Sequence, residues 1–462
     1  MAQLRPSRLA EAAAWDPTRF GHPTSSELTG RPPMVNQVHQ LSYSPLTAHA
    51  FNADRSKVAV SPNSNEICIF ASTPQGWVLE HSLTGHDKVV TGLDWAPNTN
   101  RIVSCSQDRN AYVWTLSGAT WKPTLVLLRL HRGATAVRWS PREDKFAVAS
   151  SARIISVCSF EEDNDWWVAK HIKRPLRSTV TSIDWHPNNV LLAAGCADFH
   201  ARVFSAYIKG VDTKPPPSVW GERLPFGTVC GEFPTPSAGW VHGVAFSPSG
   251  DALAFVGHDA SLTIVYPSAS QDSLPTMHVI RLPSLPYVSV MFISESALVA
   301  AGHDCQPMVF EGSAENGWRI TRSLDTVGTA ASKPKPPPPP PKKPGLGGAP
   351  APSSAGVGRL NNEEFARFRE ADTRGTSAMP SAQSTESPHS FGAVAGASIA
   401  DDGELHTTHQ NTITDIRIYS GQRGQVETIS TSGVDGRLCT FETGKGSTAI
   451  APILRGIASM RM

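Results

Sequence analysis

The sequence predicts an all-β protein in which one short unit of strands and turns is repeated around a ring, and three observations predict it. The stretch TGLDWAPNTNRIVSCSQDRNAYVW (91–114) alternates apolar and polar residues in short runs, which is the period of a half-buried strand. Proline, asparagine and aspartate separate the runs and supply the turns. The same pattern returns six more times, and such a repeat is typical of propellers and solenoids.

The spacing of the copies decides between these architectures. The aromatic or apolar residue near the end of each first strand recurs after about 44 to 46 residues, except for one step of about 61 and one of about 126. WD-repeat blades are roughly 40–45 residues long. One blade cannot bury both faces of its sheet, so blades stack in a closed ring. The sequence therefore predicts a seven-bladed WD-repeat β-propeller. The markers are Phe51, Trp95, Trp139, Trp185, Phe246, Phe292 and Ile418.

The second half of the repeat carries polar residues that have a structural role in WD blades. An aspartate followed six residues later by an aromatic residue occurs in several copies, and the fullest copy also has a histidine before it and Ser104 or Ser106 nearby. A buried aspartate is tolerated only where such partners satisfy it. We therefore expect a structural network rather than half of a catalytic set. Its expected members are His86, Asp108, Trp114, Asp198, Asp259, Asp304 and Asp435.

Composition divides the chain into four segments. Residues 1–33 are rich in proline, serine and alanine, and we expect a flexible N-terminal arm. Residues 34–325 should hold blades one to six and, at Met34–Ser44, a strand that closes the ring against the last repeat. We expect residues 326–405 to form a long, partly disordered, Pro-rich insertion between blades six and seven. Residues 406–462 hold blade seven and the C-terminus.

The insertion carries two features. Residues 333–344 contain a run of prolines flanked by lysines, which is either a ligand for a polyproline-binding domain or a stiff linker. Residues 362–372 should form a short helix that begins at a capping-box-like Asn361. Because an isolated helix this short is marginal in water, we expect it to dock on a partner, with packing on the propeller as the alternative. Its candidate binding residues are Phe365, Phe368, Arg367 and Arg369.

Blades three and four carry two further candidate contact features. The excursion Lys209–Ser237 accounts for the step of about 61 residues, and is either a contact element or a tolerated insertion. A basic run follows an acidic one at the end of blade three, and could bind an acidic partner surface or form a solvated blade edge. Its candidate residues are Lys170, Lys173, Arg174 and Arg177.

The composition argues against several classes of function. The net charge of +1 gives no case for nucleic acid binding, and no apolar run approaches the ~18 residues of a membrane span. The seven cysteines occur singly, as expected of free thiols in a reducing cytosol. The Gly-His-Asp copies at His258 and His303 fall in different blades, which favours structural histidines over a metal pair. We expect no catalytic residue, metal or cofactor.

Long blocks of the sequence resemble one known family. They include TGLDWAPNTNRIVSCSQDRNAYVW, WKPTLVLLRLHRGATAVRWSP, EDNDWWVAKHIKRPLRSTVTSIDWHPNNVLLAAG and ALVAAGHDCQPMVF. These blocks are similar to the WD-repeat subunits of the actin-related protein 2/3 complex, and the resemblance covers about 40–325 and 405–455. The N-terminal arm and the proline tract depart from the family pattern.

The resemblance implies a non-catalytic structural and regulatory subunit of the assembly that nucleates branched actin filaments. The propeller would pack on the other subunits and help to transmit activation by nucleation-promoting factors, and the inserted helix would contact actin or an activator. ATP would belong to the actin-related subunits. The implied location is the cytoplasm, at cortical actin patches. From the residues alone, a generic WD-repeat adaptor, for example a ubiquitin-ligase substrate receptor, and an enzyme on a propeller scaffold stay open.

Overall fold

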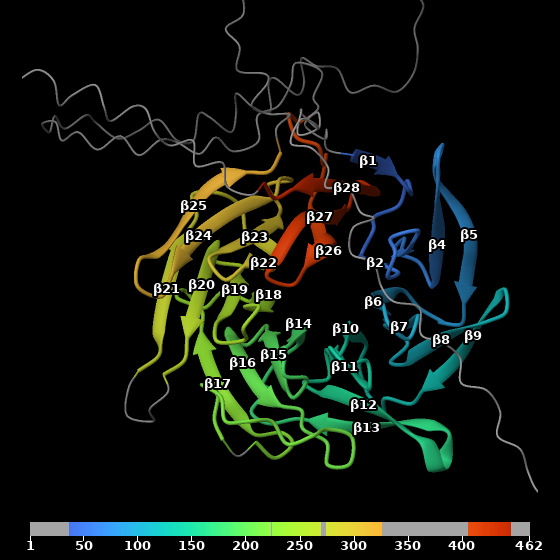
Figure 1. Ribbon diagram of the computed structural model, residues 1–462, viewed down its shortest axis with the longest axis horizontal. Helices are drawn as coiled ribbons and strands as arrows, with labels where there is room; N and C mark the ends of the chain where they lie inside the picture. Colours follow the sequence, from blue (N-terminus) through green and yellow to red (C-terminus); the bar gives the residue numbers. More distant parts are fainter. Residues whose placement is uncertain (1–36, 223, 269–273, 326–404, 445–462) are drawn as a thin grey trace, which may run out of the picture. The chain divides into compact units, whose positions relative to one another are not determined.

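The computed structural model describes residues 37–222, 224–268, 274–325 and 405–444. Within these residues the strands form seven four-stranded antiparallel sheets, which follow one another around a central axis (Figure 1). The prediction of an all-β, seven-bladed propeller is therefore confirmed. All described residues belong to one compact unit.

In the first six blades the strands follow chain order from the axis outward. Blade one holds β2 (Ala48–Phe51), β3 (Lys57–Ser61), β4 (Glu66–Thr73) and β5 (Gly76–Thr84). Blade two holds β6 (Val90–Ala96), β7 (Arg101–Ser106), β8 (Ala111–Ser117) and β9 (Thr120–Val126). Blade three holds β10 (Ala134–Trp139), β11 (Lys145–Ser150), β12 (Ile155–Glu161) and β13 (Trp166–Ile172), with a short 3-10 helix, η1 (Glu162–Asn164), before β13.

The next three blades repeat this order. Blade four holds β14 (Val180–Trp185), β15 (Leu191–Cys196), β16 (His200–Ser205) and β17 (Val229–Pro234). Blade five holds β18 (Val241–Phe246), β19 (Leu253–Gly257), β20 (Ser261–Tyr266) and β21 (Thr276–Arg281). Blade six holds β22 (Tyr287–Ser294), β23 (Ala297–Gly302), β24 (Met308–Ser313) and β25 (Gly317–Ser323).

Blade seven is made from both ends of the described chain. Its three inner strands are β26 (Ile413–Gln422), β27 (Gln425–Gly433) and β28 (Arg437–Glu442), and its outer strand is β1 (Gln37–Gln40). The register pairs Gln37 with Thr440 and Gln40 with Arg437. The expected N-terminal closing strand is thus present; it ends at Gln40 and not at the predicted Ser44, and residues 34–36 are outside the described part of the chain. Ring closure therefore joins segments almost 400 residues apart in the sequence.

Apolar clusters fill the space between every pair of neighbouring blades. The cluster between blades two and three, for example, joins Val103 and Val113 of one blade to Trp139 and Phe146 of the next. Each first-strand aromatic marker of the sequence lies in such a cluster or beside it, because the strand that carries it is buried on both faces. A blade without a neighbour would expose one of these faces, so the ring is stable only when closed.

Polar side chains also join neighbouring blades, at the turns between their first and second strands. The carboxylate of Glu143 in blade three accepts hydrogen bonds from the backbone N–H groups of Asn98 and Thr99 in blade two, at 2.8 and 2.7 Å. The side-chain oxygen of Asn189 in blade four accepts one from the N–H of Arg142 in blade three, at 2.9 Å. These contacts satisfy turn N–H groups that the sheets leave unpaired.

The excursion of blade four is packed against the propeller. The side chains of Lys145 in blade three and Asp212 in the excursion are both fully buried and form an ion pair. The side chain of Asn189 donates a hydrogen bond to Asp212 at 3.1 Å. Further along, the indole N–H of Trp220 donates to the carbonyl of Gly250 in blade five at 2.8 Å. The excursion therefore joins blades three, four and five, which gives it a structural role whether or not it also contacts a partner.

The long insertion begins after β25 and ends before β26, which places it between blades six and seven as predicted. Residues 326–404 are outside the described part of the chain. The proline tract at 333–344 and the predicted helix at 362–372 therefore also lie outside the described residues. The last part of the predicted excursion, Lys209–Ser237, includes a regular strand, β17, so the irregular part of blade four is residues 206–222 and 224–228.

Candidate partner-binding surface and its supporting network

Blade two contains a complete chain of hydrogen bonds between four side chains. The indole N–H of Trp114 donates to Ser104 Oγ at 2.9 Å, and this hydroxyl lies 2.9 Å from Nε2 of His86. The other ring nitrogen, Nδ1, lies 2.7 Å from a carboxylate oxygen of Asp108. Burial lowers the pKa of His86, and Asp108 opposes this effect. Ser104 is fully buried, so this Ser-His-Asp order holds the turn and offers no nucleophile to a substrate.

Blade seven contains a second chain of the same kind, which the sequence interpretation missed. His409 Nδ1 lies 3.0 Å from a carboxylate oxygen of Asp435, and Nε2 lies 2.7 Å from Thr431 Oγ1. Phe441 replaces the tryptophan and lies beside the imidazole, with ring centroids 6.5 Å apart. The sequence contains a signal for this chain, because His409 lies four residues before β26, as His86 lies four residues before β6. It was missed because the long insertion before His409 interrupts the spacing of the repeats.

The other expected aspartates have different partners. Asp198 accepts two hydrogen bonds from the guanidinium of Arg202, at 2.8 and 2.9 Å, in a blade that has no histidine at the position of His86. Asp259 accepts from the hydroxyl of Ser261 at 2.6 Å, and Asp304 accepts from a backbone N–H at 3.3 Å. The sequence pattern thus places these carboxylates at equivalent turns, but the histidine partner recurs only in blades two and seven among the described residues.

The two Gly-His-Asp histidines have separate partners. His258 Nδ1 lies 3.0 Å from Nε2 of His242, and its ring stacks on Trp240 with centroids 5.5 Å apart. His303 Nδ1 lies 3.1 Å from the hydroxyl of Thr412. No group of three or more His, Cys, Asp or Glu side chains suited to a metal ion occurs in the described ranges. All seven cysteines are described, and all are free thiols.

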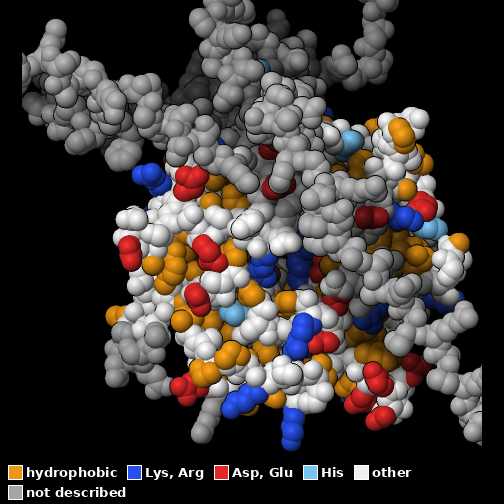
Figure 2. Space-filling view, in the orientation of Figure 1, with side chains coloured by type: hydrophobic (Ala, Val, Ile, Leu, Met, Phe, Trp, Pro, Cys, Tyr) orange, Lys and Arg blue, Asp and Glu red, His pale blue; other side chains and the backbone are white. Residues whose placement is uncertain are grey.

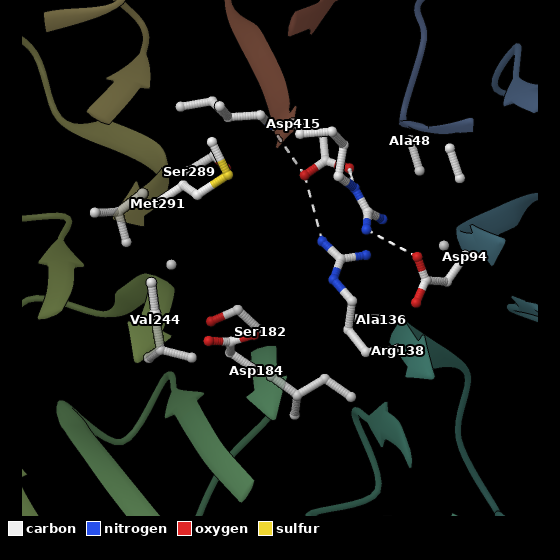
Figure 3. A pocket seen from close by; sticks show the side chains of 18 of the residues that line it. Ala48, Asp94, Ala136, Arg138, Ser182, Asp184, Val244, Ser289, Met291 and Asp415 are labelled. Carbon is white, nitrogen blue, oxygen red and sulfur yellow. Dashed lines mark hydrogen bonds and ion pairs between the residues drawn. The ribbon is translucent and has the colours of Figure 1, made fainter. Parts of the chain in front are cut away.

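The axis of the ring is a polar cavity of about 500 Å³ (Figure 3). Arg417 of blade seven donates to Asp94 of blade two at 2.8 Å and to Asp415 at 2.9 Å. Arg138 of blade three points toward Asp415 from the other side, at 3.3 Å (Figure 3). Burial alone would raise the pKa of Asp415, but Arg417 and Arg138 together hold it below its usual range. These charges are paired with one another, so the cavity is a structural junction of three blades.

One hairpin closes this junction across the ring. The turn between β26 and β27 extends from blade seven and places the guanidinium of Arg423 against the opposite side. That group donates to the carbonyl of Trp185 in blade four at 3.2 Å and to that of Phe246 in blade five at 3.3 Å. It also lies 3.6 Å from a carboxylate oxygen of Asp184. The hairpin therefore cross-links blades that are not neighbours.

A histidine beside this junction should make the protein sensitive to acid. His49 is fully buried between the hydroxyls of Ser430 and Ser432, and burial lowers its pKa to about 3. In the folded state His49 therefore stays neutral at pH 5, whereas in the unfolded state it is protonated below a pH of about 6.5. We expect this group to remove about 2 kcal/mol of the free energy of unfolding between pH 7 and pH 5.

Urea denaturation at several pH values would test this expectation. The His49→Gln variant should show a smaller loss of stability between pH 7 and pH 5 than the wild type, whereas the exposed-site variant His131→Gln should keep the wild-type slope. Equal slopes for all three proteins would contradict the assignment to His49.

Three of the four described candidate partner-binding residues lie at one end of the blades, whereas Phe365, Arg367, Phe368 and Arg369 are outside the described residues. In an up-and-down blade, the loops from fourth to first strands and the turns from second to third strands occur at the same end. Lys173, Arg174 and Arg177 lie in the loop that enters blade four and are exposed, whereas Lys170 lies on the outer strand β13. We call this end the loop face. Its exposed cations in blades two to four form a basic surface: Lys88, Arg109, Arg129, Arg132, Arg153, Lys173, Arg174 and Arg177.

Two properties of the loop face suit it to a partner. None of the basic-surface side chains forms an ion pair with another described residue, so their charges are available to an external anion. In blades four to six the same end exposes apolar side chains instead, namely Phe199, Trp240 and Leu285, which are 38%, 52% and 55% exposed. In the view of Figure 2, acidic, basic and apolar side chains are interspersed over the ring, and Lys and Arg side chains lie near its centre.

Comparison with protein-family models supports the WD repeat that the sequence predicts. The family model "WD domain, G-beta repeat" matches residues 77–115, and the model "Anaphase-promoting complex subunit 4 WD40 domain" matches residues 137–214. The first match starts in β5 and ends in β8, so the sequence repeat spans two structural blades. No helix among the described residues is long and apolar enough to cross a membrane.

Curated relatives match the chain over almost their whole length. "Actin-related protein 2/3 complex subunit 1" of Schizosaccharomyces pombe is 46% identical over 87% of this chain and 98% of its own length. Subunit 1A-B of Xenopus laevis is 43% identical over 88% and 96%, and subunit 1 of Saccharomyces cerevisiae is 36% identical over 88% and 97%. With this identity over this coverage, the chain belongs to the family of actin-related protein 2/3 complex subunit 1 proteins.

Proposed function

We propose that the chain is a non-catalytic structural and regulatory subunit of an actin-related protein 2/3 complex, which nucleates branched actin filaments. The observation that supports this most is the identity of 46% to a protein named as subunit 1 of that complex, over 98% of its length. The paired charges of the central cavity and the buried Ser104 favour a scaffold over an enzyme. The proposed location is the cytoplasmic actin cytoskeleton, including cortical patches.

In this proposal the rigid ring presents two contact regions. The blades pack on the other subunits, as expected for a ring whose interior is closed by its own hairpin. The insertion between blades six and seven carries the proposed helix 362–372, which contacts the actin filament or an activator, and the proline tract 333–344, which could bind a polyproline-binding domain. The proposed domain boundaries are therefore 1–33, 34–325, 326–405 and 406–462.

The basic surface is the proposed site for an acidic segment of another subunit or of a nucleation-promoting factor. Its cations come from three consecutive blades, so the rigid ring fixes their spacing before a partner arrives. Preorganised charge raises the rate of association with an acidic partner and makes binding sensitive to salt. The neighbouring apolar side chains, such as Trp240, would add a contact area that salt does not weaken.

Charge reversal tests this function directly. The variant Lys173→Glu, Arg174→Glu, Arg177→Glu should lower activator-stimulated branching by roughly tenfold at low salt, because it replaces attraction by repulsion. The difference should shrink as ionic strength rises and the charges are screened. Branches would be counted by fluorescence microscopy with purified complex.

A matched control carries the same change of charge elsewhere. Lys122, Lys209 and Lys214 are exposed and lie outside the basic surface. Their triple replacement by glutamate should leave branching near the wild-type rate. Equal branching by the two triple variants, or a loss that does not depend on salt, would contradict the proposed role of the basic surface.

A further inference from the structure

A groove lies between blades six and seven, away from the basic surface and from the central cavity. Its volume is about 1060 Å³, and it is lined by residues from all four strands of blade six, by the start of β27, and by Thr443 and Gly444, which follow β28. Pockets that bind small ligands typically have volumes of about 300–1,000 Å³. A groove of this size is therefore large enough to hold several side chains of a docked segment. Ala297, Trp318 and Val426 form part of its wall, with Glu311 and Glu427 also among its lining residues.

The described part of the chain ends beside this groove. β28 ends at Glu442, and the two residues that follow it, Thr443 and Gly444, belong to the groove lining together with Gln425 and Val426 of β27. A partly apolar groove at the end of a strand is a surface on which another segment can pack.

The chain itself leaves the described residues at this groove. The backbone N–H of Thr443 donates to the carbonyl of Glu427 at 2.9 Å, and its hydroxyl donates to the carbonyl of Val426 at 2.6 Å. The guanidinium of Arg322 in blade six donates to the carbonyl of Thr443. Thr443, which directly follows β28, is thus bonded to β27 on one side and to blade six on the other. Thr443 and Gly444 both line the groove. The next residues are within reach of its wall, at up to about 3.5 Å of chain per residue.

The sequence that follows has the composition of a segment that is buried on one side. Residues 445–462 read KGSTAIAPILRGIASMRM. They contain isoleucines at 450, 453 and 457 and no acidic residue, and their cations are Lys445, Arg455 and Arg461. The carboxylates at the groove, Glu311 and Glu427, are partly or fully exposed. Arg319 and Arg322 are also at the groove, but Arg322 is already engaged with Glu311 and Thr443.

From this geometry we infer that the groove between blades six and seven is the docking site of the chain's own segment 445–462. The apolar side chains of the segment would pack on Trp318 and Val426, and its cations would face Glu311 and Glu427. The docked segment would continue from the end of β28 and would join the last blade to blade six. This role is independent of the proposed function.

Photo-crosslinking in the full-length chain tests the inference. A photoreactive amino acid at Ile453 should crosslink within one molecule to residues 311–322 or 425–427, as mapped by mass spectrometry. The same group at Leu127, which is 59% exposed and follows β9 of blade two, is the control and should give no crosslink to the groove. Crosslinks from position 453 to another part of the ring, or only to a second molecule, would overturn the proposal.

A second measurement distinguishes this segment from other occupants. The Ile453→Asp, Ile457→Asp variant should increase hydrogen exchange of β25 and of residues 425–427 at least severalfold, with no change in blades two to four. If exchange at the groove is unchanged by this variant but rises when residues 1–36 are removed, the N-terminal arm occupies the groove and the proposal is wrong.

Discussion

Replacing Phe365 and Phe368 by alanine is expected to lower branch formation by roughly 30-fold while leaving assembly of the complex intact. The two rings are three positions apart, so a helix over 362–372 would present them on one face. Aromatic anchors buried in an interface typically contribute about 2 kcal/mol or more each, and loss of one such contribution already gives this factor. The measurement is branch density at fixed actin and activator, with purified complex.

Two controls separate docking from folding. The Phe365→Leu, Phe368→Leu variant keeps apolar anchors of smaller size and should give intermediate branching. Co-purification of the other subunits should be the same for all three proteins, because the insertion joins two four-stranded sheets and interrupts neither. Wild-type branching by the alanine variant would show that Phe365 and Phe368 do not bind actin or an activator, and would contradict the prediction.

Replacing Asp212 by alanine is expected to lower the free energy of unfolding by about 3–5 kcal/mol, which is a large fraction of the stability of a typical domain. The side chains of Lys145 and Asp212 are both fully buried, and the carboxylate also accepts hydrogen bonds from Asn189 and from the backbone N–H of Ile208 at 2.8 Å. Burial lowers the pKa of Lys145, and Asp212 opposes this effect. Without Asp212, a buried ammonium group would have to lose its proton or draw water inward.

A double variant shows whether the charge itself is the cause. Lys145→Met, Asp212→Leu removes both charges and should recover much of the lost stability, since an apolar pair of similar size often substitutes for a buried ion pair. Thermal denaturation of the purified chain would measure both variants. If the single and double variants are equally destabilised, the loss comes from packing of the excursion and not from the unpaired lysine.

The repeat made the ring predictable from sequence. Strand period, turn residues and spacing are local signals, and each of the seven first strands carries its own marker, such as Trp95 or Trp139. The closing strand was predictable in kind because a ring needs one, but its end at Gln40 was not, because the pairing of Gln40 with Arg437 depends on residues far apart in the chain. His409 was missed for a related reason, since the long insertion breaks the spacing before the last repeat.

The contacts that join blades could not be predicted from local patterns. Lys145 and Asp212 are 67 positions apart, and Arg417 reaches Asp94 across 323 positions. A single charged residue at such a distance has no periodic signal, and only the closed ring brings the partners together. The basic surface shows the same limit. The sequence indicated the run around Lys173, but the cations of Arg109 and Arg153 join it only because equivalent turns meet at one end of the blades.

Affinity purification of this chain at mild salt tests the central claim most directly. A subunit of the proposed complex should elute with two actin-related proteins and with further small subunits in a fixed one-to-one ratio, as measured by quantitative mass spectrometry. Elution of the chain alone, or with ubiquitin-ligase components in place of actin-related proteins, would contradict the account.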